Sequence, residues 1–418
     1  MPSYRVKNMA VTIAKEGADN FAKATYPIRV GKYSEIKTPD YEFHFNLSGQ
    51  IRFIRGLGLN WRHPGELLKR TDGNDWVYYS LGSVGERIVT WLGEYYLPCP
   101  AYMTNAVYEY NPFADPVVMG ALGAWAQLYA NLYELERDGL APQVRDFFDL
   151  IRQSDETSLH ERAGKLHSII GGRNSVLPPD TRQVDYEVIP LTVADGCRYH
   201  CKFCCVKSAN RYEPRSRESV MEQIGQLKEF YGPNLGNYKA LFLGDHDALG
   251  AGEEALLSAA SEALSAFELK TPMLFMFGSV DSLLEAGARL FDELNEIFDH
   301  TYINLGLESV HGPSLASIGK PLDVAKVNEA FHKMLWLNRE YENLEVTANF
   351  LLGDKLPPGH NEALMELLQS APEPANRKGA IYLSPLLESQ NKRELLDNFF
   401  EIKQQSKLPA YIYLIQRL

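Results

Sequence analysis

Three of the five cysteines of this chain lie within one short stretch, residues 195–204. They are Cys197, Cys201 and Cys204, separated by three and then two residues, so their thiolates can converge on one metal centre from a single loop. Three ligands leave one iron of a four-iron cluster open, and an open position is typical of a catalytic rather than a structural metal site. The stretch therefore predicts a catalytic iron–sulfur centre.

Two other arrangements of these cysteines remain open. A structural zinc site would require further ligands at paired spacing, and His200 inside the cluster would crowd its neighbours. Cys205 could replace Cys204 as the third ligand, but both spacings would then be three and Phe203 would no longer directly precede the ligand. Only Cys99 and Cys205 lie outside the three, too few for a second cluster held by cysteines.

The spacing, with the aromatic Phe203 before the last cysteine, resembles the signature of the radical S-adenosylmethionine (SAM) superfamily. The resemblance implies a 4Fe–4S cluster on Cys197, Cys201 and Cys204, with Phe203 beside the cofactors. It also implies that SAM chelates the open iron and that an electron from the cluster cleaves it to methionine and a 5′-deoxyadenosyl radical. A low-potential electron donor such as flavodoxin or ferredoxin is the implied partner.

The elements that would position this loop follow a regular alternation. Short apolar runs are found at 188–193, 240–243, 273–277, 302–305, 346–352 and 380–383, and amphipathic helical stretches at 219–230, 253–267, 282–298, 324–339, 362–370 and 393–405. Six such units predict an α/β fold with a parallel sheet and right-handed crossovers. The resemblance implies an open partial (β/α)6 barrel over residues 181–418, with the cysteines at the carboxyl end of its first strand. Residues 412–418 are expected to form a final strand.

Residues 1–180 follow a different pattern. Predicted strands or extended segments are 26–30, 41–47 and 76–81, and predicted helices cover 122–132 and 144–151. Residues 171–180, with paired glycines and paired prolines, have the composition of a linker. We therefore expect a separate N-terminal α+β domain, a substrate or lid domain that covers the barrel mouth and excludes water from a radical.

The loop after the second predicted strand places a glycine beside carboxylates, as Gly244, Asp245, His246 and Asp247. The resemblance implies that the backbone at Gly244, with Asp245 beside it, holds the amino group of SAM, since glycine permits close approach. We expect His246 and Asp247 to face the substrate as a catalytic proton donor and acceptor. An ordinary strand-to-helix turn capped by aspartate is the alternative.

Other strand ends carry further candidates. Glu308 and Ser309, after the fourth strand, resemble the pattern of the superfamily branch that holds elongator-type, methylthiotransferase and coproporphyrinogen dehydrogenase enzymes, which implies contact with the methionine or ribose of SAM. Arg215 lies in a run that resembles the methylthiotransferases and could clamp the SAM carboxylate. Residues 348–354 resemble the family's adenine-contacting segment. A solvated strand end and a solvated helix start are the respective alternatives for the polar residues.

The composition limits partners and compartment. The 418 residues carry a formal net charge of −12, which argues against nucleic acid as a partner. Five cysteines, three of them in the metal motif, indicate the reducing cytoplasm rather than a disulfide framework. Polar residues interrupt the apolar stretch 117–135, so we expect a buried helix there and no membrane span.

The leading hypothesis is an enzyme whose 5′-deoxyadenosyl radical abstracts a hydrogen atom from a small-molecule substrate. A methyltransferase that uses two SAM molecules is a second hypothesis, and S-adenosylhomocysteine among the products would favour it. A non-enzymatic haem-binding relative is the third, since ten histidines could supply axial ligands, although no haem motif stands out.

Overall fold

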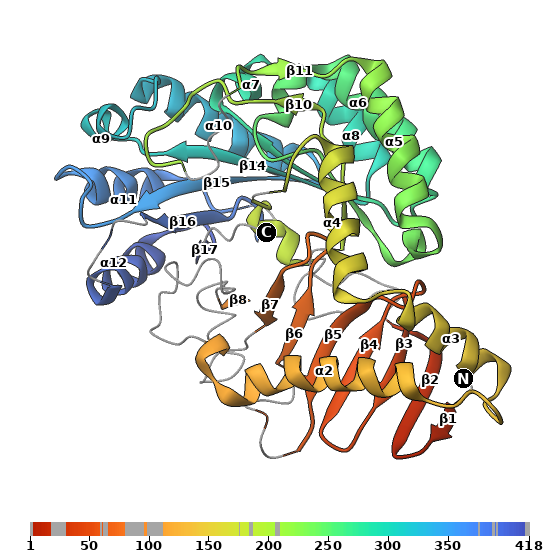
Figure 1. Cartoon of the computed structure of the whole chain (residues 1–418). Helices are drawn as coiled ribbons and strands as arrows, with labels where there is room; N and C mark the ends of the chain where they lie inside the picture. Colours follow the sequence, from red (N-terminus) through yellow and green to blue (C-terminus); the bar gives the residue numbers. More distant parts are fainter. Residues whose placement is uncertain are drawn as a thin grey trace.

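Two large sheets organise the described part of the chain (Figure 1). The computed structural model describes residues 3–17, 31–58, 61, 66–79, 96–97, 112–174, 176–183, 187–204, 210–374, 377–386, 389 and 392–413. The first sheet is antiparallel and formed by the early part of the chain, and the second is parallel and formed by the later part.

The antiparallel sheet has eight strands in sequence order, each paired with the next. They are β1 (Ser3–Val6), β2 (Met9–Glu16), β3 (Lys32–Lys37), β4 (Tyr41–Phe45), β5 (Ile51–Gly56), β6 (Leu67–Arg70), β7 (Trp76–Tyr79) and β8 (Tyr96–Leu97). The strands predicted at 41–47 and 76–81 are confirmed by β4 and β7, whereas 26–30 lies outside the described residues.

Two helices, α2 (Pro116–Glu134) and α3 (Pro142–Arg152), cover this sheet and confirm the predicted helices at 122–132 and 144–151 (Figure 1). Their aromatic side chains pack on the sheet: the ring centroids of Trp125 and Phe147 lie 5.6 and 5.5 Å from that of Phe45. Among the described residues, no helix combines the length and the apolar character that a membrane span requires.

The parallel sheet has seven strands in the order β17-β16-β15-β14-β13-β12-β9. They are β9 (Val188–Pro190), β12 (Ala240–Phe242), β13 (Met273–Gly278), β14 (His300–Glu308), β15 (Leu344–Leu352), β16 (Ile381–Pro385) and β17 (Ala410–Ile412). All six predicted strands are present, and every neighbouring pair is parallel. The final strand starts earlier than predicted, and 414–418 lies outside the described residues.

Helices separate these strands along the chain. They include α5 (Arg217–Tyr231), α6 (Glu253–Phe267), α7 (Val280–Glu285), α8 (Ala288–Ile297), α9 (Gly312–Ser317), α10 (Val324–Glu340), α11 (His360–Ser370) and α12 (Lys392–Gln405). The single helix predicted at 282–298 is wrong, because α7 ends at Glu285, Ala286 and Gly287 are extended, and α8 begins after them. Glycine is a poor residue for a helix interior, so the break falls there.

The two sheets are joined by α4 (Glu156–Ile170) and by buried charges. Leu166 and Ile170 of α4 belong to the hydrophobic core of the parallel sheet, so packing crosses the predicted boundary at residue 180. Lys69 Nζ on β6 lies 2.8 Å from Glu187 Oε1, directly before β9, and both side chains are buried. The antiparallel sheet is thereby tied to the strand that leads into the cysteines.

Candidate functional site

The cysteines lie in a loop that is closed at its base by a short ladder. Strand β10 (Ala194–Asp195) pairs antiparallel with β11 (Glu213–Pro214). Arg215, directly after β11, donates to both carboxylate oxygens of Asp195, at 2.8 and 2.7 Å, and to Ile170 O at 3.0 Å. Arg215 therefore closes the base of the loop, and it is not among the described residues that line the cavity discussed below.

All three cysteines of the motif line one cavity. None of these described cysteines is in a disulfide. Cys201 is buried, and burial raises the pKa of its thiol to about 11, partly opposed by the charge of Lys320. The backbone N–H of Lys202 donates to Ile318 O at 2.8 Å, which fixes the loop (residues 196–204, here called the cysteine loop) against the segment after β14. Three thiols around one cavity fit the donor set of an iron–sulfur cluster.

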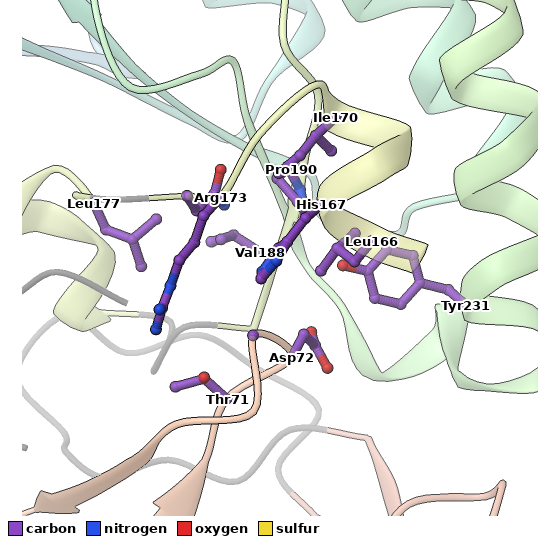
Figure 2. A pocket seen from close by; sticks show the side chains of 12 residues that line it. Thr71, Asp72, Leu166, His167, Ile170, Arg173, Leu177, Val188, Pro190 and Tyr231 are labelled. Atoms are coloured by element: carbon purple, nitrogen blue, oxygen red, sulfur yellow. The ribbon is translucent and has the colours of Figure 1, made fainter. Parts of the chain in front are cut away.

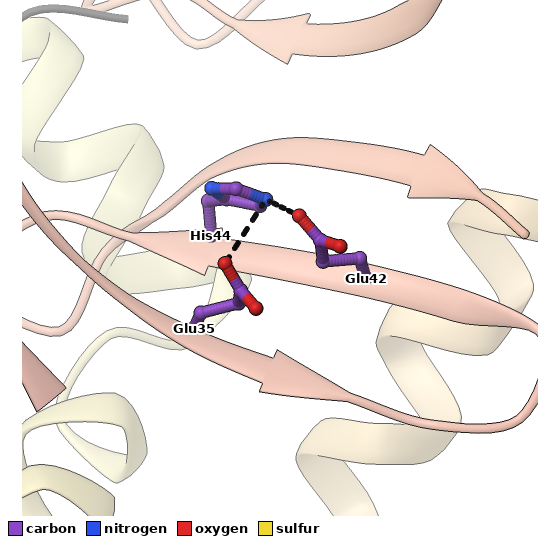
Figure 3. Close-up of side chains that lie close together, drawn as sticks. All are labelled: Glu35, Glu42 and His44. Carbon is purple, nitrogen blue, oxygen red and sulfur yellow. Dashed lines mark hydrogen bonds and ion pairs between the residues drawn. The ribbon is translucent and has the colours of Figure 1, made fainter. Parts of the chain in front are cut away.

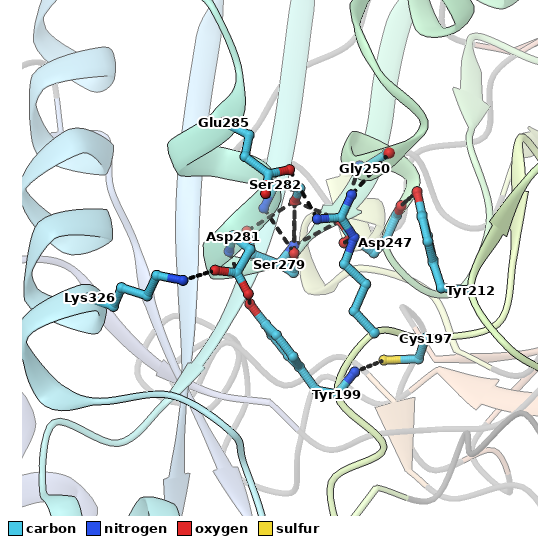
Figure 4. A network of polar contacts seen from close by, with 11 residues as sticks. Cys197, Tyr199, Tyr212, Asp247, Gly250, Ser279, Asp281, Ser282, Glu285 and Lys326 are labelled. Atoms are coloured by element: carbon cyan, nitrogen blue, oxygen red, sulfur yellow. Dashed lines mark hydrogen bonds and ion pairs between the residues drawn. The ribbon is translucent and has the colours of Figure 1, made fainter.

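Side chains between the first two cysteines anchor the cysteine loop to neighbouring strand ends (Figure 4). The Tyr199 hydroxyl donates to Asp281 Oδ2 at 2.8 Å and accepts from the Asp281 backbone N–H at 2.9 Å. Arg198 lies 3.4 Å from Asp247 Oδ2 and 3.0 Å from Glu285 Oε2. The first half of the cysteine loop is therefore held by the loops that follow β12 and β13.

The cavity contains about 990 Å³ of empty space, including the part that opens to solvent. Its described lining, besides the three cysteines, is Val176, Tyr199, His200, Phe203, Asp245, His246, Asp247, Phe277, Gly278, Ser279, Gly306, Glu308, Lys320, Asn349, Ser384 and Tyr413. The structure thus brings together Phe203, Asp245, His246, Asp247 and Glu308 from the sequence-based candidates.

Glu308 lies at the end of β14 in an irregular stretch of backbone. The pairing of β14 with β15 shifts between Gly306 and Glu308, and Glu308 has a φ of +67°, which is uncommon outside glycine. Lys320 Nζ donates to Gly306 O at 2.5 Å and lies 3.6 Å from Glu308 Oε1. Burial raises the pKa of Glu308, and the Lys320 ammonium opposes this. A buried carboxylate and ammonium therefore meet at the cavity wall, and a strained position of this kind is often functional.

In the loop after β12, some residues line the cavity and others stabilise the fold. Gly244 has a φ of +97°, and a Cβ there would find Thr192 at 3.7 Å, so the backbone angle rather than crowding favours glycine. Asp247 Oδ1 accepts from Ser279 N at 3.0 Å and from Ser282 Oγ at 2.7 Å (Figure 4). Asp247 thus joins this loop to the start of α7, although it also lines the cavity.

Two predicted cofactor residues, Gly244 and Ser309, are not among the described lining residues. Ser309 is fully buried, and its hydroxyl lies 3.0 Å from His360 Nδ1 and accepts from His311 N at 3.0 Å. Sequence reasoning missed Lys320, which reaches the cavity from the turn after α9. The signal that could have identified it is a lysine soon after the strand that ends in Glu308.

A second, smaller cavity, with about 450 Å³ of empty space including the part that opens to solvent, lies between the turn after β6, α4 and β9 (Figure 2). Asp72 and His167 line it. The Asp72 carboxylate is already paired with Arg52 and accepts from the Tyr238 hydroxyl at 2.7 Å. Burial, followed by the charge of Arg173, lowers the pKa of His167. No described cysteine lines this cavity.

Within the part of the chain that the structure describes, one other group of side chains could hold a metal ion: Glu35, Glu42 and His44, buried on β3 and β4 (Figure 3). His44 Nε2 lies 2.5 Å from Glu42 Oε1 and 4.0 Å from Glu35 Oε2. Lys15 Nζ lies 2.8 Å from Glu35 Oε2. Arg55 lies 2.8 Å from Glu42 Oε2, so both carboxylates already have cationic partners.

No model of a known protein family matches the sequence, and no curated protein matches it. Solved structures show a partial likeness. A radical SAM methyltransferase from Sphaerobacter thermophilus has a TM-score of 0.38 and 15% identity, over 54% of this chain and 65% of its own. The cobalamin-dependent S-adenosylmethionine radical enzyme OxsB, with aqua-cobalamin bound, has a TM-score of 0.35 and 16% identity, over 55% of this chain and 33% of its own.

A spore photoproduct lyase mutant with bound AdoMet and dinucleoside spore photoproduct has a TM-score of 0.38 and 10% identity, over 72% of this chain and 95% of its own. This chain spans less than two thirds of the length of the methyltransferase and of OxsB. Every TM-score is below 0.5, so the function proposed below rests on the cysteine loop and its cavity.

Proposed function

We propose that this chain is a radical SAM enzyme that holds a 4Fe–4S cluster on Cys197, Cys201 and Cys204 and binds SAM in the adjoining cavity. The observation that carries the proposal is that three thiols at this spacing line one cavity, beside residues from the ends of parallel strands. When bound, the cluster and SAM would supply a 5′-deoxyadenosyl radical that abstracts a hydrogen atom from a small organic substrate.

The residues of the chain would bind and orient the cofactor. Asp245, beside the backbone at Gly244, can accept hydrogen bonds from the ammonium group of SAM. The carboxylate of Glu308 can accept from the ribose hydroxyls, and Lys320 can pair with the SAM carboxylate. Phe203 lines the cavity beside the cysteines, where its ring would exclude water.

His246 is the proposed proton donor or acceptor for the substrate, because it lines the cavity and an imidazole can both donate and accept a proton. Asp247 would act with it mainly by positioning, since its Oδ1 already accepts hydrogen bonds at the start of α7. The parallel sheet would form the open partial barrel, and residues 1–180 its cover. A flavodoxin or ferredoxin would supply the electron.

Anaerobic reconstitution tests the proposal. The protein should bind about four irons per chain, as one cubane cluster requires, and should release 5′-deoxyadenosine from SAM when reduced with dithionite. Absence of 5′-deoxyadenosine from protein that holds the full cluster would reject SAM cleavage. Equal amounts of S-adenosylhomocysteine and 5′-deoxyadenosine would instead support the methyltransferase alternative.

A further inference from the structure

The part of the cavity formed by β15 and β16 differs in chemistry from the part near the cysteines. Asn349 and Ser384 line it. They lie on the same face of the sheet, because Asn349 pairs with Tyr382, two residues before Ser384. The charged or titratable described residues of the lining, apart from the cysteines and tyrosines, come from the cysteine loop, from the β12 loop and from around β14: His200, Asp245, His246, Asp247, Glu308 and Lys320.

The Ser384 hydroxyl is the most direct sign of a missing partner. Ser384 is 3% exposed, and its Oγ has no hydrogen-bond partner among the described residues. A buried hydroxyl without a partner is costly, and buried polar groups in folded proteins are nearly always hydrogen-bonded. Ser384 lines the cavity, so a rotation about its Cα–Cβ bond would turn the enclosed hydroxyl toward a bound molecule, which can supply the partner.

The orientation of the Asn349 amide is fixed by a chain of hydrogen bonds that starts at a buried carboxylate. Asp180 Oδ2 accepts from the Thr347 hydroxyl at 3.1 Å. The Thr347 oxygen accepts from Asn304 Nδ2 at 2.8 Å, and Asn304 Oδ1 accepts from Asn349 Nδ2 at 2.7 Å. Asn349 must therefore present its amino group to Asn304. Asn304 Nδ2 also donates to Asn349 Oδ1 at 3.3 Å, so the Asn349 amide, which lines the cavity, keeps one N–H and one lone pair for a ligand.

The chain of hydrogen bonds from Asp180 to Asn349 also favours an uncharged ligand. Asp180 is fully buried, and its carboxylate accepts a second hydrogen bond, from the Tyr382 hydroxyl at 2.6 Å. An anionic group beside Asn349 would be repelled by this carboxylate. No cationic side chain from β15 or β16 in the described lining would offset that repulsion. A cationic group would lose its hydration without an anionic partner on the same two strands.

We propose that this end of the cavity binds the substrate, and not the adenine of SAM that the resemblance of residues 348–354 implies there, and that the substrate is an uncharged molecule. It would present a hydroxyl or amide group to Ser384 and Asn349 and an apolar part to Phe277, which lines the same cavity. The assignment rests on the proposed function, because it places the substrate at β15 and β16, which β12, β13 and β14 separate in the sheet from β9, the strand before the cysteines.

Ligand retention tests the assignment without requiring turnover. Small-molecule cell extract is separated by ion exchange into neutral, anionic and cationic fractions, and each is incubated with the protein and SAM before gel filtration and mass spectrometry. We expect compounds from the neutral fraction to be retained. Ser384→Ala and Asn349→Leu should each lower their retention about three- to tenfold, the value of one or two hydrogen bonds.

Thr301→Val is the matched control. Thr301 is a second fully buried residue whose hydroxyl has no partner among the described residues, but it lies near the start of β14 and outside the described lining. It should retain the neutral compounds as the unaltered protein does. Thermal unfolding of each variant confirms that it is folded.

Three results would overturn the assignment: retention of charged compounds, no retention from the neutral fraction, or equal retention by the unaltered protein and both cavity variants. A loss of SAM affinity in Ser384→Ala that matches the loss of retention would place the hydroxyl against the cofactor and overturn it as well. Protein that binds no iron, or holds a full cluster without cleaving SAM, rejects the proposed function instead, and the two failures are therefore distinguishable.

Discussion

Two regions of the molecule each gather three groups that can ligate a metal: the sheet cluster of Glu35, Glu42 and His44, and the cysteine loop. Only in the sheet cluster do other side chains already balance the charges of the ligands. In the sheet cluster, Lys15 and Arg55 already pair with the two carboxylates. Burial acts to raise the pKa of Glu42, but the hydrogen bonds and charges of His44 and Arg55 outweigh it and lower this pKa to about 2. A metal ion at the sheet cluster would have to displace cationic side chains.

The cysteine loop presents the opposite situation. Burial raises the pKa of Cys201 to about 11, so this thiol keeps its proton when no metal is bound. A metal that binds Cys201 would displace the proton of the thiol and would not have to break an ion pair of the folded protein. The comparison shows that ligand residue types alone do not define a metal site, because the partners they already have decide what a metal must displace.

The largest expected effect is the loss of iron from the cysteine loop. Replacing Cys197, Cys201 and Cys204 together by alanine should reduce bound iron from about four per chain to near zero after anaerobic reconstitution. The matched control is Glu42→Gln in the sheet cluster, which should keep the full iron content. Iron that stays in the triple variant, or leaves in the control, would reverse the assignment of the two clusters.

The second effect concerns stability at the sheet cluster. The pKa of Glu42 lies at about 2 in the folded chain, against an ordinary value of 4.5, so its ionised form stabilises the fold above pH 4.5. This stabilisation, about 3 kcal/mol, is lost as the pH falls toward 2. Glu42→Gln should therefore lower the free energy of unfolding most at pH 7, and the difference from the unaltered protein should shrink at pH 3, as urea titrations can measure.

Glu16→Gln provides the control for this stability prediction. Glu16 forms an exposed ion pair with Lys32 at 3.0 Å, and both side chains are more than half exposed. An exposed pair contributes less than about 1 kcal/mol, so little change is expected at either pH. A pH-independent effect of Glu42→Gln would mean that packing rather than charge explains the role of Glu42.

The third prediction concerns the charged pair in the cavity. Glu308→Gln should weaken SAM binding by about 1 to 2 kcal/mol, roughly tenfold, because a charge-assisted hydrogen bond to the cofactor is lost. Calorimetry on anaerobic protein measures the affinity. Glu345→Gln is the control, since Glu345 is also buried but accepts from Gly379 N at 3.2 Å, outside the described lining. Equal affinities in both variants would assign Glu308 to the fold.

The sequence predicted the parallel sheet well because its strands are buried and its helices amphipathic, so both leave clear periodicities. The break between α7 and α8 was missed, since one glycine changes a helix too little to alter its pattern. The three cysteines were identifiable because they are close in sequence. Lys320 was given no role, and Asn349 was noted only within the segment 348–354, because tertiary packing brings these two side chains to the cavity beside the cysteines.

Replacement of Arg215 should have the smallest effect, and it tests directly whether the role predicted from the sequence or the contact in the structure is correct. The sequence predicted a contact with the SAM carboxylate, whereas the structure pairs Arg215 in bidentate geometry with Asp195. Arg215→Lys keeps the charge but loses the bidentate hydrogen bonds of the guanidinium to Asp195. The free energy of unfolding should therefore fall by about 0.5 to 1 kcal/mol, a small value because the Asp195 side chain is 40% exposed. Iron content and SAM affinity should stay as they are, and Arg217→Lys, on a more exposed arginine paired with Glu262, should change neither stability nor binding. If Arg215→Lys instead weakens SAM binding without loss of stability, Arg215 moves from its carboxylate partner to the cofactor, and the sequence-based role is correct.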